Sequence, residues 1–517
     1  MTALPPDEPA GIAPAPDAWA RRSTLGMGLG ALASKGLGFA REVVLARFFG
    51  TGPVADAYRS ALTFTLSPAH LLSTHAVQTC FIPLYTRLRT ENRPRATALY
   101  QGLLLVFLAV GLLLAVALYA GAGALARVLL PGFDPERREL TAAMLRIMAP
   151  GVPAYIYCTL LASLGAGQRD YALPTIRPGL QNLGLLLMIA IAVGARRPVL
   201  AAWGFTLTYL VLSAGGTWLL HARGLLPKQW QLIRSEVASL ARTYWRPLRP
   251  LLLLSVLVQG NILVERLLAS LVGGGTIAAM DYARFILEST HALLLMPLGL
   301  VSLARFAGLG ERELRETADR VLGLMMLLLV PVSAFLAFSG GPLIQALYQR
   351  GAFDQLSQAM TQRAMLGLGA GLWAVSASYF LRSVLHARMD NGTVLRGETI
   401  AVALNVAFVL LTYRRLGILA LGLGPSLGAL GSLAFYFVRL RFRAPRAPGR
   451  LLLLLAGVPF HAVLVAAIRS RLTGTWPAAV AQLLLAGTFW AIWIGAWRPL
   501  RAAAREGWRR GNRGTDR

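Results

Sequence analysis

Acidic residues, cysteines and charged residues in general are scarce in this sequence. Only 23 of the 517 residues are Asp or Glu, and the four charged types together make up 14%, against about 25% in soluble globular domains. Two cysteines, Cys80 and Cys158, lie in apolar stretches, and no CxxC, CxxH or HExxH pattern occurs. The sequence therefore predicts neither a disulfide framework nor a metal site, and it excludes an ordinary cytosolic enzyme.

Apolar residues and cations are abundant instead. Apolar residues form 56% of the chain, and the mean hydropathy is +0.57. The 51 Lys and Arg residues give a net charge of +28, which in a soluble protein would indicate nucleic-acid binding. The hydropathy favours a membrane protein without a nucleic-acid partner. Because lipid offers the backbone no hydrogen-bonding partners, we expect an all-α polytopic membrane protein.

Apolar segments of about 20 residues, each long enough to cross a bilayer, predict about fourteen transmembrane helices. The predicted spans are 25–49, 55–85, 98–122, 142–164, 172–194, 199–221, 248–271, 276–304, 321–348, 364–385, 397–413, 417–438, 451–468 and 478–497. Outside them we expect a flexible cytoplasmic tail at 1–24, a basic amphipathic linker at 222–247 and a basic cytoplasmic tail at 498–517. A plain polar loop is the alternative for the linker.

The distribution of the cations predicts the topology. With the N-terminus inside, the cytoplasmic segments carry 32 Lys and Arg residues and the outer loops carry 11. This bias follows the positive-inside rule and predicts that both termini are cytoplasmic. The remaining 8 cations lie within the predicted spans.

Short motifs recur at a nearly constant offset and predict a duplicated bundle. Asp56–Arg59 in the first half parallels Asp281–Arg284 in the second, and Gly132–Asp134 parallels Ala352–Asp354 in the same order. Six spans separate equivalent elements, so the halves share one orientation and are related by an axis along the membrane normal. The predicted parts are an N-lobe at 25–221, a C-lobe at 248–443 and two further helices at 444–497.

Ionisable residues within the spans are the candidate functional residues, because a charge at the bilayer centre costs about 2.5–3.5 kcal/mol on insertion scales. Interhelical ion pairing or snorkelling is the alternative, which we favour for residues near helix ends. The candidates for holding an anion are Lys35, Arg41, Arg59 and Arg284; the supporting or ion-coupling acids are Asp56, Glu265, Asp281 and Glu288; possible headgroup contacts are His70 and His75. For these histidines, packing in a neutral, hydrogen-bonded form is the commoner case.

A series of motifs runs along nearly the whole chain. It includes Ser34–Glu42, Ala55–Tyr58, Pro131–Asp134, Tyr282–Arg284 and Ala387–Asp390. No single motif is decisive, but in this order they resemble the MurJ/MviN family, the lipid II flippases of the MOP superfamily.

The resemblance implies a transporter with two six-helix lobes around a V-shaped, cation-lined cavity. Two extra C-terminal helices help to form a groove for the undecaprenyl tail. Members move a lipid-linked peptidoglycan precursor from the inner to the outer leaflet by alternating access, with the membrane potential implicated. The essential cations of the family correspond to Lys35, Arg41 and Arg284 in this sequence. The acid at the start of span 2 corresponds to Asp56, and an acid of span 7 that is implicated in ion binding in some members corresponds to Glu265.

Further expectations follow from the resemblance. We expect a monomer in the bacterial inner membrane that acts in peptidoglycan biosynthesis and maintains cell shape, needs no cofactor and is driven by the membrane potential or by a gradient of an unspecified ion. Association with the cell-envelope synthesis machinery stays open. We expect Arg41 and Arg284 to bind the pyrophosphate from opposite lobes, so that the anion relieves their repulsion and favours closure.

The sequence departs from the family pattern in span 2 and span 8. Ala69-His70 stands where the family usually has two arginines, Lys35 replaces an arginine, and Glu288–His291 replaces Glu-Phe-Pro. These departures leave open a flippase for another lipid-linked oligosaccharide, such as an exopolysaccharide or O-antigen repeat unit. A cation-coupled drug exporter of the MATE type is disfavoured by the excess of cations, and an enzyme by the lack of a catalytic carboxylate pair or metal motif.

Overall fold

The structure is a computed structural model, and every regular element that it describes is a helix. It describes residues 18–73, 75–227, 234–306, 310–388, 390–440, 447–469 and 475–511. Within these ranges, some side chains are not described. These include the side chains at 72–79 and 234–251, so that of His75 lies outside the description.

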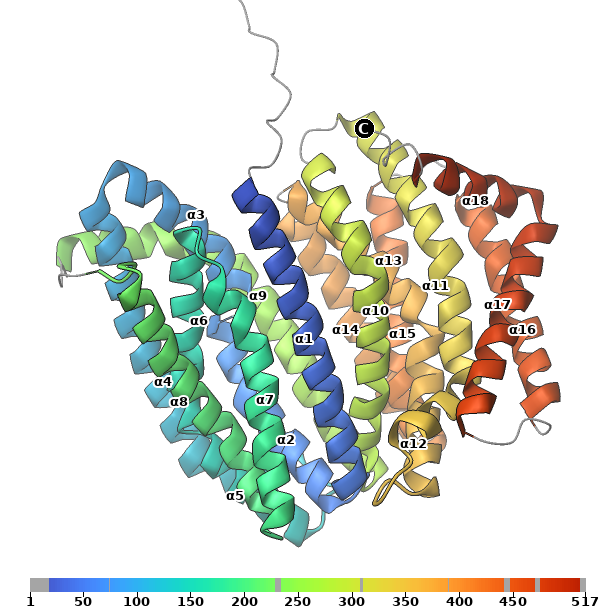
Figure 1. The fold of residues 1–517 in the computed structure, drawn as a ribbon, viewed down its shortest axis with the longest axis horizontal. Coiled ribbons are helices and arrows are strands. Elements are labelled where there is room, and N and C mark those ends of the chain that lie inside the picture. The colour runs from blue at the N-terminus through green and yellow to red at the C-terminus, as the bar shows by residue number, and fades with distance from the viewer. Residues whose placement is uncertain are drawn as a thin grey trace, which may run out of the picture.

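The first half of the chain folds into a bundle that we call the N-terminal bundle (Figure 1). Helices α1 and α7 pack along each other, α2 lies against α5 and α6, and α8 packs on α6 and α7. Its helices are α1 (Ala18–Phe49), α2 (Pro53–Ser73), α3 (His75–Glu91), α4 (Arg93–Leu129), α5 (Pro135–Met148), α6 (Gly151–Gly167), α7 (Ala172–Gly194), the short 3-10 helix η1 (Pro198–Ala202) and α8 (Trp203–Ala222).

The C-terminal bundle lies beside the first, and two more long helices cover its far side (Figure 1). Helix α9 belongs to this half but also packs against α2, α3 and α4. The helices of the bundle are α9 (Arg234–Val272), α10 (Thr276–Phe306), α11 (Glu311–Tyr348), α12 (Gln355–Ala370), α13 (Leu372–Ala387), α14 (Asn391–Leu416) and α15 (Ile418–Arg439). They are followed by α16 (Ala447–Arg469), α17 (Thr475–Ala496) and α18 (Arg498–Gly511).

Long apolar helices dominate the described part of the chain. Nine of them are long and apolar enough to cross a membrane, and the bent pairs α5 with α6 and α12 with α13 raise the number to 11. The fourteen predicted spans also include α1, α2 with α3, and α10, which do not pass this test in the described residues. These three carry the predicted site charges Lys35, Arg41, Asp56, Arg59, Asp281, Arg284 and Glu288. The charges of the predicted site therefore lie in the segments that do not qualify as apolar spans.

The two bundles repeat the same local features. The bent pairs occupy equivalent places in each half, with bends of 48° between α5 and α6 and 47° between α12 and α13. Each pair begins with an aspartate that caps the helix: Asp134 accepts from the Arg137 backbone N–H, and Asp354 accepts from that of Ser357. These are the aspartates that the sequence repeat pairs with each other.

Hydrogen bonds between the bundles, among the described residues, gather toward the end that carries the α1–α2 turn, which we call the Gly50 end. The turns there use residues with positive φ, Gly50 at 51° and Gly351 at 61°, a conformation that glycine adopts without steric cost. The bonds join Ala352 N–H to Arg47 O (2.7 Å), Tyr282 OH to Gly50 O (2.9 Å), Thr51 Oγ1 to Ser357 Oγ (2.8 Å) and Gly132 N–H to Ser270 Oγ (3.3 Å).

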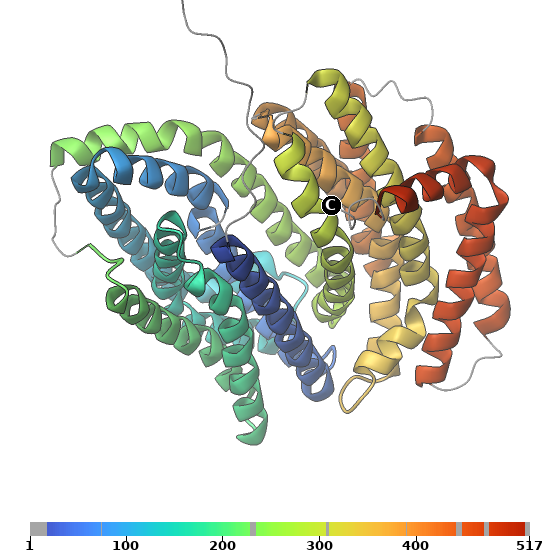
Figure 2. The same ribbon diagram turned by 45° about the horizontal axis from the view of Figure 1, so that its top comes forward.

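Helices extend into three segments that were predicted to lie outside the spans. Helix α1 begins at Ala18, so residues 18–24 are helical and not a tail, because a helix can continue into polar sequence beyond the bilayer. Residues 234–247 belong to the same helix as the following span, and Figure 2 shows α9 curving across the end of the N-terminal bundle. Residues 498–511 form α18, whose Leu500 is fully buried against the core. Residues 1–17, 228–233 and 512–517, which include Lys228–Trp230 of the predicted linker, lie outside the described residues.

Candidate functional site

Asp281 on α10 is the centre of an ion-pair network between the bundles. Its carboxylate accepts hydrogen bonds from Arg266 of α9 at 2.8 and 2.9 Å. Arg59 of α2, in the other bundle, approaches it at 3.4 Å, and Arg284, one turn along α10, lies at 3.8 Å. Three guanidinium groups therefore converge on a single carboxylate.

The network continues from this centre into both bundles. On the N-terminal side, Arg59 pairs with Glu42 at 2.5 Å, and Arg41 pairs with the other oxygen of Glu42 at 2.7 Å. On the C-terminal side, Arg284 donates to both oxygens of Glu265 at 2.6 and 2.8 Å. The result is a continuous chain of charges that runs from α1 through α2 and α10 to α9.

Mutual neutralisation explains how so many charges can lie within apolar helices. A charge taken out of water without a partner costs several kcal/mol, whereas paired and hydrogen-bonded charges recover much of that cost. The network and its surroundings contain five cations, Lys35, Arg41, Arg59, Arg266 and Arg284, against four acids, Glu42, Glu265, Asp281 and Glu288. The charges thus nearly balance, with one cation in excess.

Exposure divides the arginines of the network into two groups. The side chains of Arg59 and Arg266 are only 8% and 7% exposed, whereas those of Arg41 and Arg284 are 18% and 25% exposed. Arg59 also lies 4.3 Å from the centroid of the Tyr282 ring, so protein groups surround it. An incoming anion can therefore reach Arg41 and Arg284, while Arg59 and Arg266 hold the acids in place behind them.

Lys35 and Glu288 lie at the exposed margin of the same region. Both residues are exposed, Lys35 on α1 and Glu288 on α10. Phe39 of α1 also stacks on Phe285 of α10 at a ring separation of 6.4 Å. No ion pair joins Lys35 to a described residue, so the excess cation of the network is the one most accessible to an anion.

Substitution of Arg59 tests whether the enclosed arginines stabilise the protein more than the exposed ones do. Arg59→Ala would leave Glu42 and Asp281 short of a buried partner, and breaking a buried ion pair typically costs about 3–5 kcal/mol. We expect a clearly lower unfolding temperature for the purified protein in detergent, with partial recovery in Arg59→Lys. Arg41→Ala, at the exposed margin, should change the unfolding temperature much less. An equal fall in unfolding temperature in Arg59→Ala and Arg41→Ala would contradict this distinction between enclosed and exposed arginines.

Asp56, a predicted member of the site, has a different environment. It is fully buried and accepts hydrogen bonds from the backbone N–H groups of Gly275 (2.6 Å) and Ala278 (3.0 Å), with Arg137 at 3.4 Å. These N–H groups form the start of α10, where a helix has unsatisfied donors and a positive dipole end. Asp56 of one bundle therefore caps a helix of the other, at the Gly50 end.

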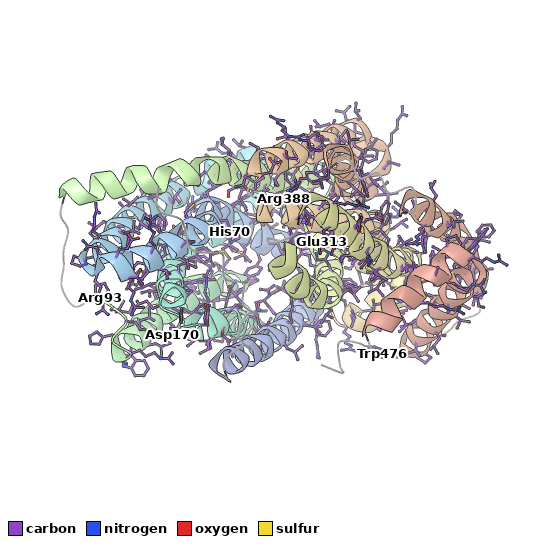
Figure 3. All side chains as sticks on the ribbon, turned by 90° about the horizontal axis from the view of Figure 1, so that it is seen from above. His70, Arg93, Asp170, Glu313, Arg388 and Trp476 are labelled. Carbon is purple, nitrogen blue, oxygen red and sulfur yellow. The ribbon has the colours of Figure 1, made fainter. Side chains whose placement is uncertain are left out.

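The predicted histidine His70 lies away from the network, in a cluster within the N-terminal bundle. Its ring is 5.8 Å from that of Tyr155, and the guanidinium of Arg177 lies over the same tyrosine at 5.0 Å. Seen from above in Figure 3, His70 lies toward the middle of the molecule. The side chain of His75 is not described, so its prediction remains untested.

Four residues of this region were not selected from the sequence. Glu42 and Arg266 are ionisable residues in predicted spans, and selecting every such residue would have found them. Asn182 accepts from Arg41 at 3.0 Å and donates to the backbone oxygen of Ser34, and no sequence signal distinguishes it from other polar residues. Arg177 lies near the start of the predicted span 172–194 and of α7, and it was counted with the cytoplasmic cations and not with the candidate site residues.

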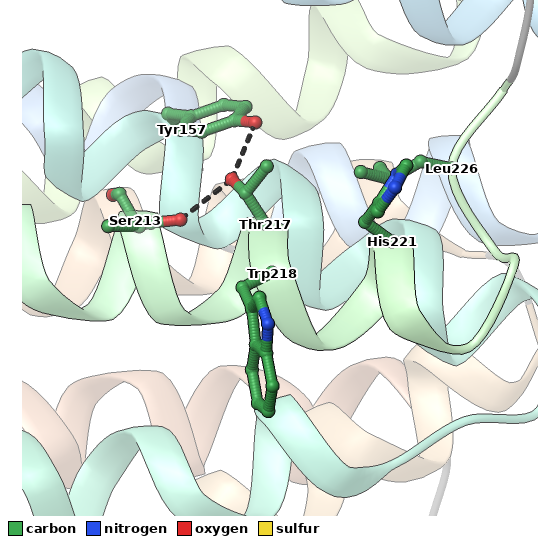
Figure 4. Close-up of a pocket in the computed structure, with 7 residues that line it drawn as sticks. Tyr157, Ser213, Thr217, Trp218, His221 and Leu226 are labelled. Carbon is green, nitrogen blue, oxygen red and sulfur yellow. Dashed lines mark hydrogen bonds between the residues drawn. The ribbon is translucent and has the colours of Figure 1, made fainter.

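A separate pocket lies on α6 and α8 and contains none of the network residues. It has a volume of about 470 Å³, and within it the hydroxyls of Tyr157 and Thr217 are hydrogen-bonded at 2.9 Å (Figure 4). Its lining residues are Tyr157, Ser213, Ala214, Thr217, Trp218, His221 and Leu226. Within the described part of the chain, no group of three or more His, Cys, Asp or Glu side chains is placed to hold a metal ion.

The fold and the network define the class: an all-helical polytopic membrane protein of two related bundles, with the architecture of a transporter. The family model described as lipid II flippase MurJ matches residues 45–489, and the chain belongs to this family. The predicted fold class and family are therefore confirmed.

Curated relatives and solved structures agree with this assignment. The probable lipid II flippase MurJ of Rhizobium tropici is 26% identical over 404 residues, covering 74% of this chain and 73% of the relative. The lipid II flippase MurJ of Burkholderia cenocepacia is 26% identical over 437 residues, covering 81% and 83%. A solved lipid II flippase MurJ in an inward closed conformation shares the fold with a TM-score of 0.78 at 16% identity, covering 90% of this chain and 97% of that one.

A MATE transporter of the MOP superfamily has a related fold. Its inward-facing structure matches with a TM-score of 0.65 at 14% identity, covering 81% of this chain and 98% of the transporter. At these identities, the structural matches establish the fold, and the function has to be argued from the site.

Proposed function

We propose that this protein flips lipid II, the undecaprenyl-pyrophosphate-linked peptidoglycan precursor, from the inner to the outer leaflet of the cytoplasmic membrane. The observation that carries the proposal is the network itself, in which Lys35, Arg41 and Arg284 stand accessible at the margin of two bundles. A pyrophosphate needs cations from more than one side, and arginine binds phosphate oxygens with paired N–H donors.

Alternating access is the proposed mechanism. The Gly50 end faces outward and both termini face the cytoplasm, which agrees with the excess of cations in the predicted cytoplasmic segments. The hydrogen bonds at the Gly50 end, together with the Asp56 cap, then close the outer side while the headgroup enters from the cytoplasm. Their rupture would accompany opening to the outside.

The anion is proposed to act on the network by exchange of partners. Arg41 and Arg284 lie on opposite bundles, and each is paired with a carboxylate, Glu42 or Glu265. A pyrophosphate that bound both guanidinium groups would weaken these pairs and draw the bundles together. The acids released in this way, with Asp281 and Glu288, are the candidates for coupling to the membrane potential or to an ion gradient.

The polyprenyl tail is proposed to lie along the apolar side of the C-terminal bundle. Two cavities of about 250 and 200 Å³ occur there, where α11 and α13 meet α16. Apart from Ser333 and Arg450, their lining is apolar: Val330, Ala334, Ala337, Phe338, Ala370, Trp373, Leu455, Val458 and Pro459 in the first, and Leu322, Gly323, Met326, Trp373, Ala377, Leu433, Phe437 and Leu451 in the second. A monomer without a cofactor and without catalytic activity is sufficient for this mechanism.

Reconstitution tests the proposed substrate. We expect the purified protein in proteoliposomes to move labelled lipid II between leaflets, and its gene to rescue a strain depleted of its peptidoglycan flippase. An undecaprenyl-pyrophosphate-linked exopolysaccharide repeat unit is the matched control substrate. Transport of that lipid without transport of lipid II would contradict the peptidoglycan assignment while leaving the flippase class intact.

A further inference from the structure

Arg177 of α7 lies over two aromatic rings. Its guanidinium carbon lies 5.0 Å from the centre of the Tyr155 ring and 5.7 Å from that of the Tyr209 ring. Tyr209 is fully buried and donates a hydrogen bond to Gln181 at 2.7 Å, and His70 lies beside Tyr155. We call Arg177, His70, Tyr155, Tyr209 and Gln181 the Arg177 cluster.

The Arg177 cluster contains no acid. The rings over which Arg177 lies belong to Tyr155 and Tyr209, and no described carboxylate forms an ion pair with it. The network arginines Arg41 and Arg284, by contrast, each contact a carboxylate at less than 3 Å. Cation–π contacts give a desolvated arginine about 2 kcal/mol, which is less than burial of an unpaired charge costs.

The C-terminal bundle contains the corresponding cluster with its charge balanced. The ring of His291 on α10 lies 5.7 Å from that of Tyr379 on α13, and the guanidinium of Arg382 lies over the same tyrosine at 5.2 Å. In the N-terminal bundle, His70 on α2 and Arg177 on α7 contact Tyr155 on α6 in the same way. Here, however, Glu398 of α14 pairs with Arg382 at 2.7 Å. Helix α14 is the repeat counterpart of α7, so one bundle has an acid on the helix where the other has the arginine.

We propose that Arg177 is an anion-binding residue of the N-terminal bundle, and that it takes a phosphate or carboxylate group of the transported headgroup. This inference rests on the proposed flippase function. Arg177 is five residues before Asn182, the partner of Arg41, which corresponds to about 7.5 Å along α7. Along the helix axis, an oxyanion at Arg177 therefore lies on the terminal side of Asn182, which is the side from which the headgroup enters.

Direct binding of inorganic phosphate tests the site without any lipid. The titration uses the full-length protein in detergent and a chloride-free buffer, in an Arg284→Gln background that weakens the central site. We expect this variant to retain phosphate binding and the double variant Arg177→Gln/Arg284→Gln to bind about tenfold or more weakly, because one charge-assisted contact is lost. Arg177→Lys in the same background should restore most of the affinity. Equal binding by the single and double variants, at equal unfolding temperatures, overturns the proposal and leaves the flippase assignment standing.

Lipid transport then identifies the source of the anion. In proteoliposomes, Arg177→Gln alone should raise the lipid concentration for half-maximal flipping by about tenfold with little change in the maximal rate, since one ground-state contact is removed. The matched control is Arg127→Gln, an exposed cation of α4 whose side chain donates a hydrogen bond to the Gly123 carbonyl. If chloride competes for Arg177 as well as phosphate does, and Arg177→Gln flips lipid like the wild type, the site holds a free anion and the headgroup assignment fails.

Discussion

Arg284→Ala is expected to abolish rescue of a flippase-depleted strain. In proteoliposomes it should reduce the rate of flipping by about 10- to 100-fold, because the loss of one or more charge-assisted hydrogen bonds to the substrate corresponds to a change of that size. Arg284 is among the accessible guanidinium groups of the network, and it lies opposite Arg41 across the two bundles. Without it, a pyrophosphate would be held from one bundle only and could not draw the two together. Arg41→Ala should have the same effect for the same reason.

Loss of Arg284 also leaves Glu265 without its partner, and this second effect has to be separated from the first. In Arg284→Ala/Glu265→Gln, the stranded carboxylate is neutralised, so a purely structural defect should be relieved. We expect the unfolding temperature to recover in this double variant and flipping to remain lost. Recovery of flipping would show that Arg284 serves only to balance Glu265. Membrane expression, and the exposed-site variant Arg127→Ala, are the controls.

A disulfide across the Gly50 end is expected to arrest transport. Thr51 in the α1–α2 turn and Ser357 of α12 have hydroxyl oxygens 2.8 Å apart, so cysteines at both positions lie close enough to bridge. In a background with the native Cys80 and Cys158 replaced by alanine, oxidation of T51C/S357C should lower flipping at least about tenfold, and a reductant should restore it. The reason is that the outer side cannot open while the bundles are linked.

A cross-link within one bundle is the matched control for this experiment. Ser378 of α13 and Ser432 of α15 are hydrogen-bonded at 3.2 Å inside the C-terminal bundle. Oxidised S378C/S432C should flip lipid at a rate close to that of its reduced form, because rigid-body motion of the bundles leaves this distance unchanged. Full transport by a completely cross-linked T51C/S357C protein would mean that the Gly50 end is not the outer gate.

Part of the site could be predicted from helical spacing alone. Asp281 and Arg284 lie at i and i+3 on one helix, and the pair is present at 3.8 Å. The pairing of Arg59 with Glu42, on another helix, could not be predicted, because it depends on how α1 and α2 pack. The hydrogen bonds from Gly275 and Ala278 to Asp56 connect opposite halves of the chain and join the two bundles, so no local pattern indicates them.

The sequence by itself determined that this chain is a bundle of membrane-spanning helices with a repeat, and which helices carry charge. Hydropathy and helical periodicity act over about 20 residues, so they are readable along the chain. Only the tertiary structure decided which carboxylate each arginine faces and that Arg59 is enclosed while Arg284 is accessible. It also decided that Arg177 pairs with none of the described acids. The physical reason is that an ion pair forms within about 4 Å, and helix packing alone sets such distances between remote segments.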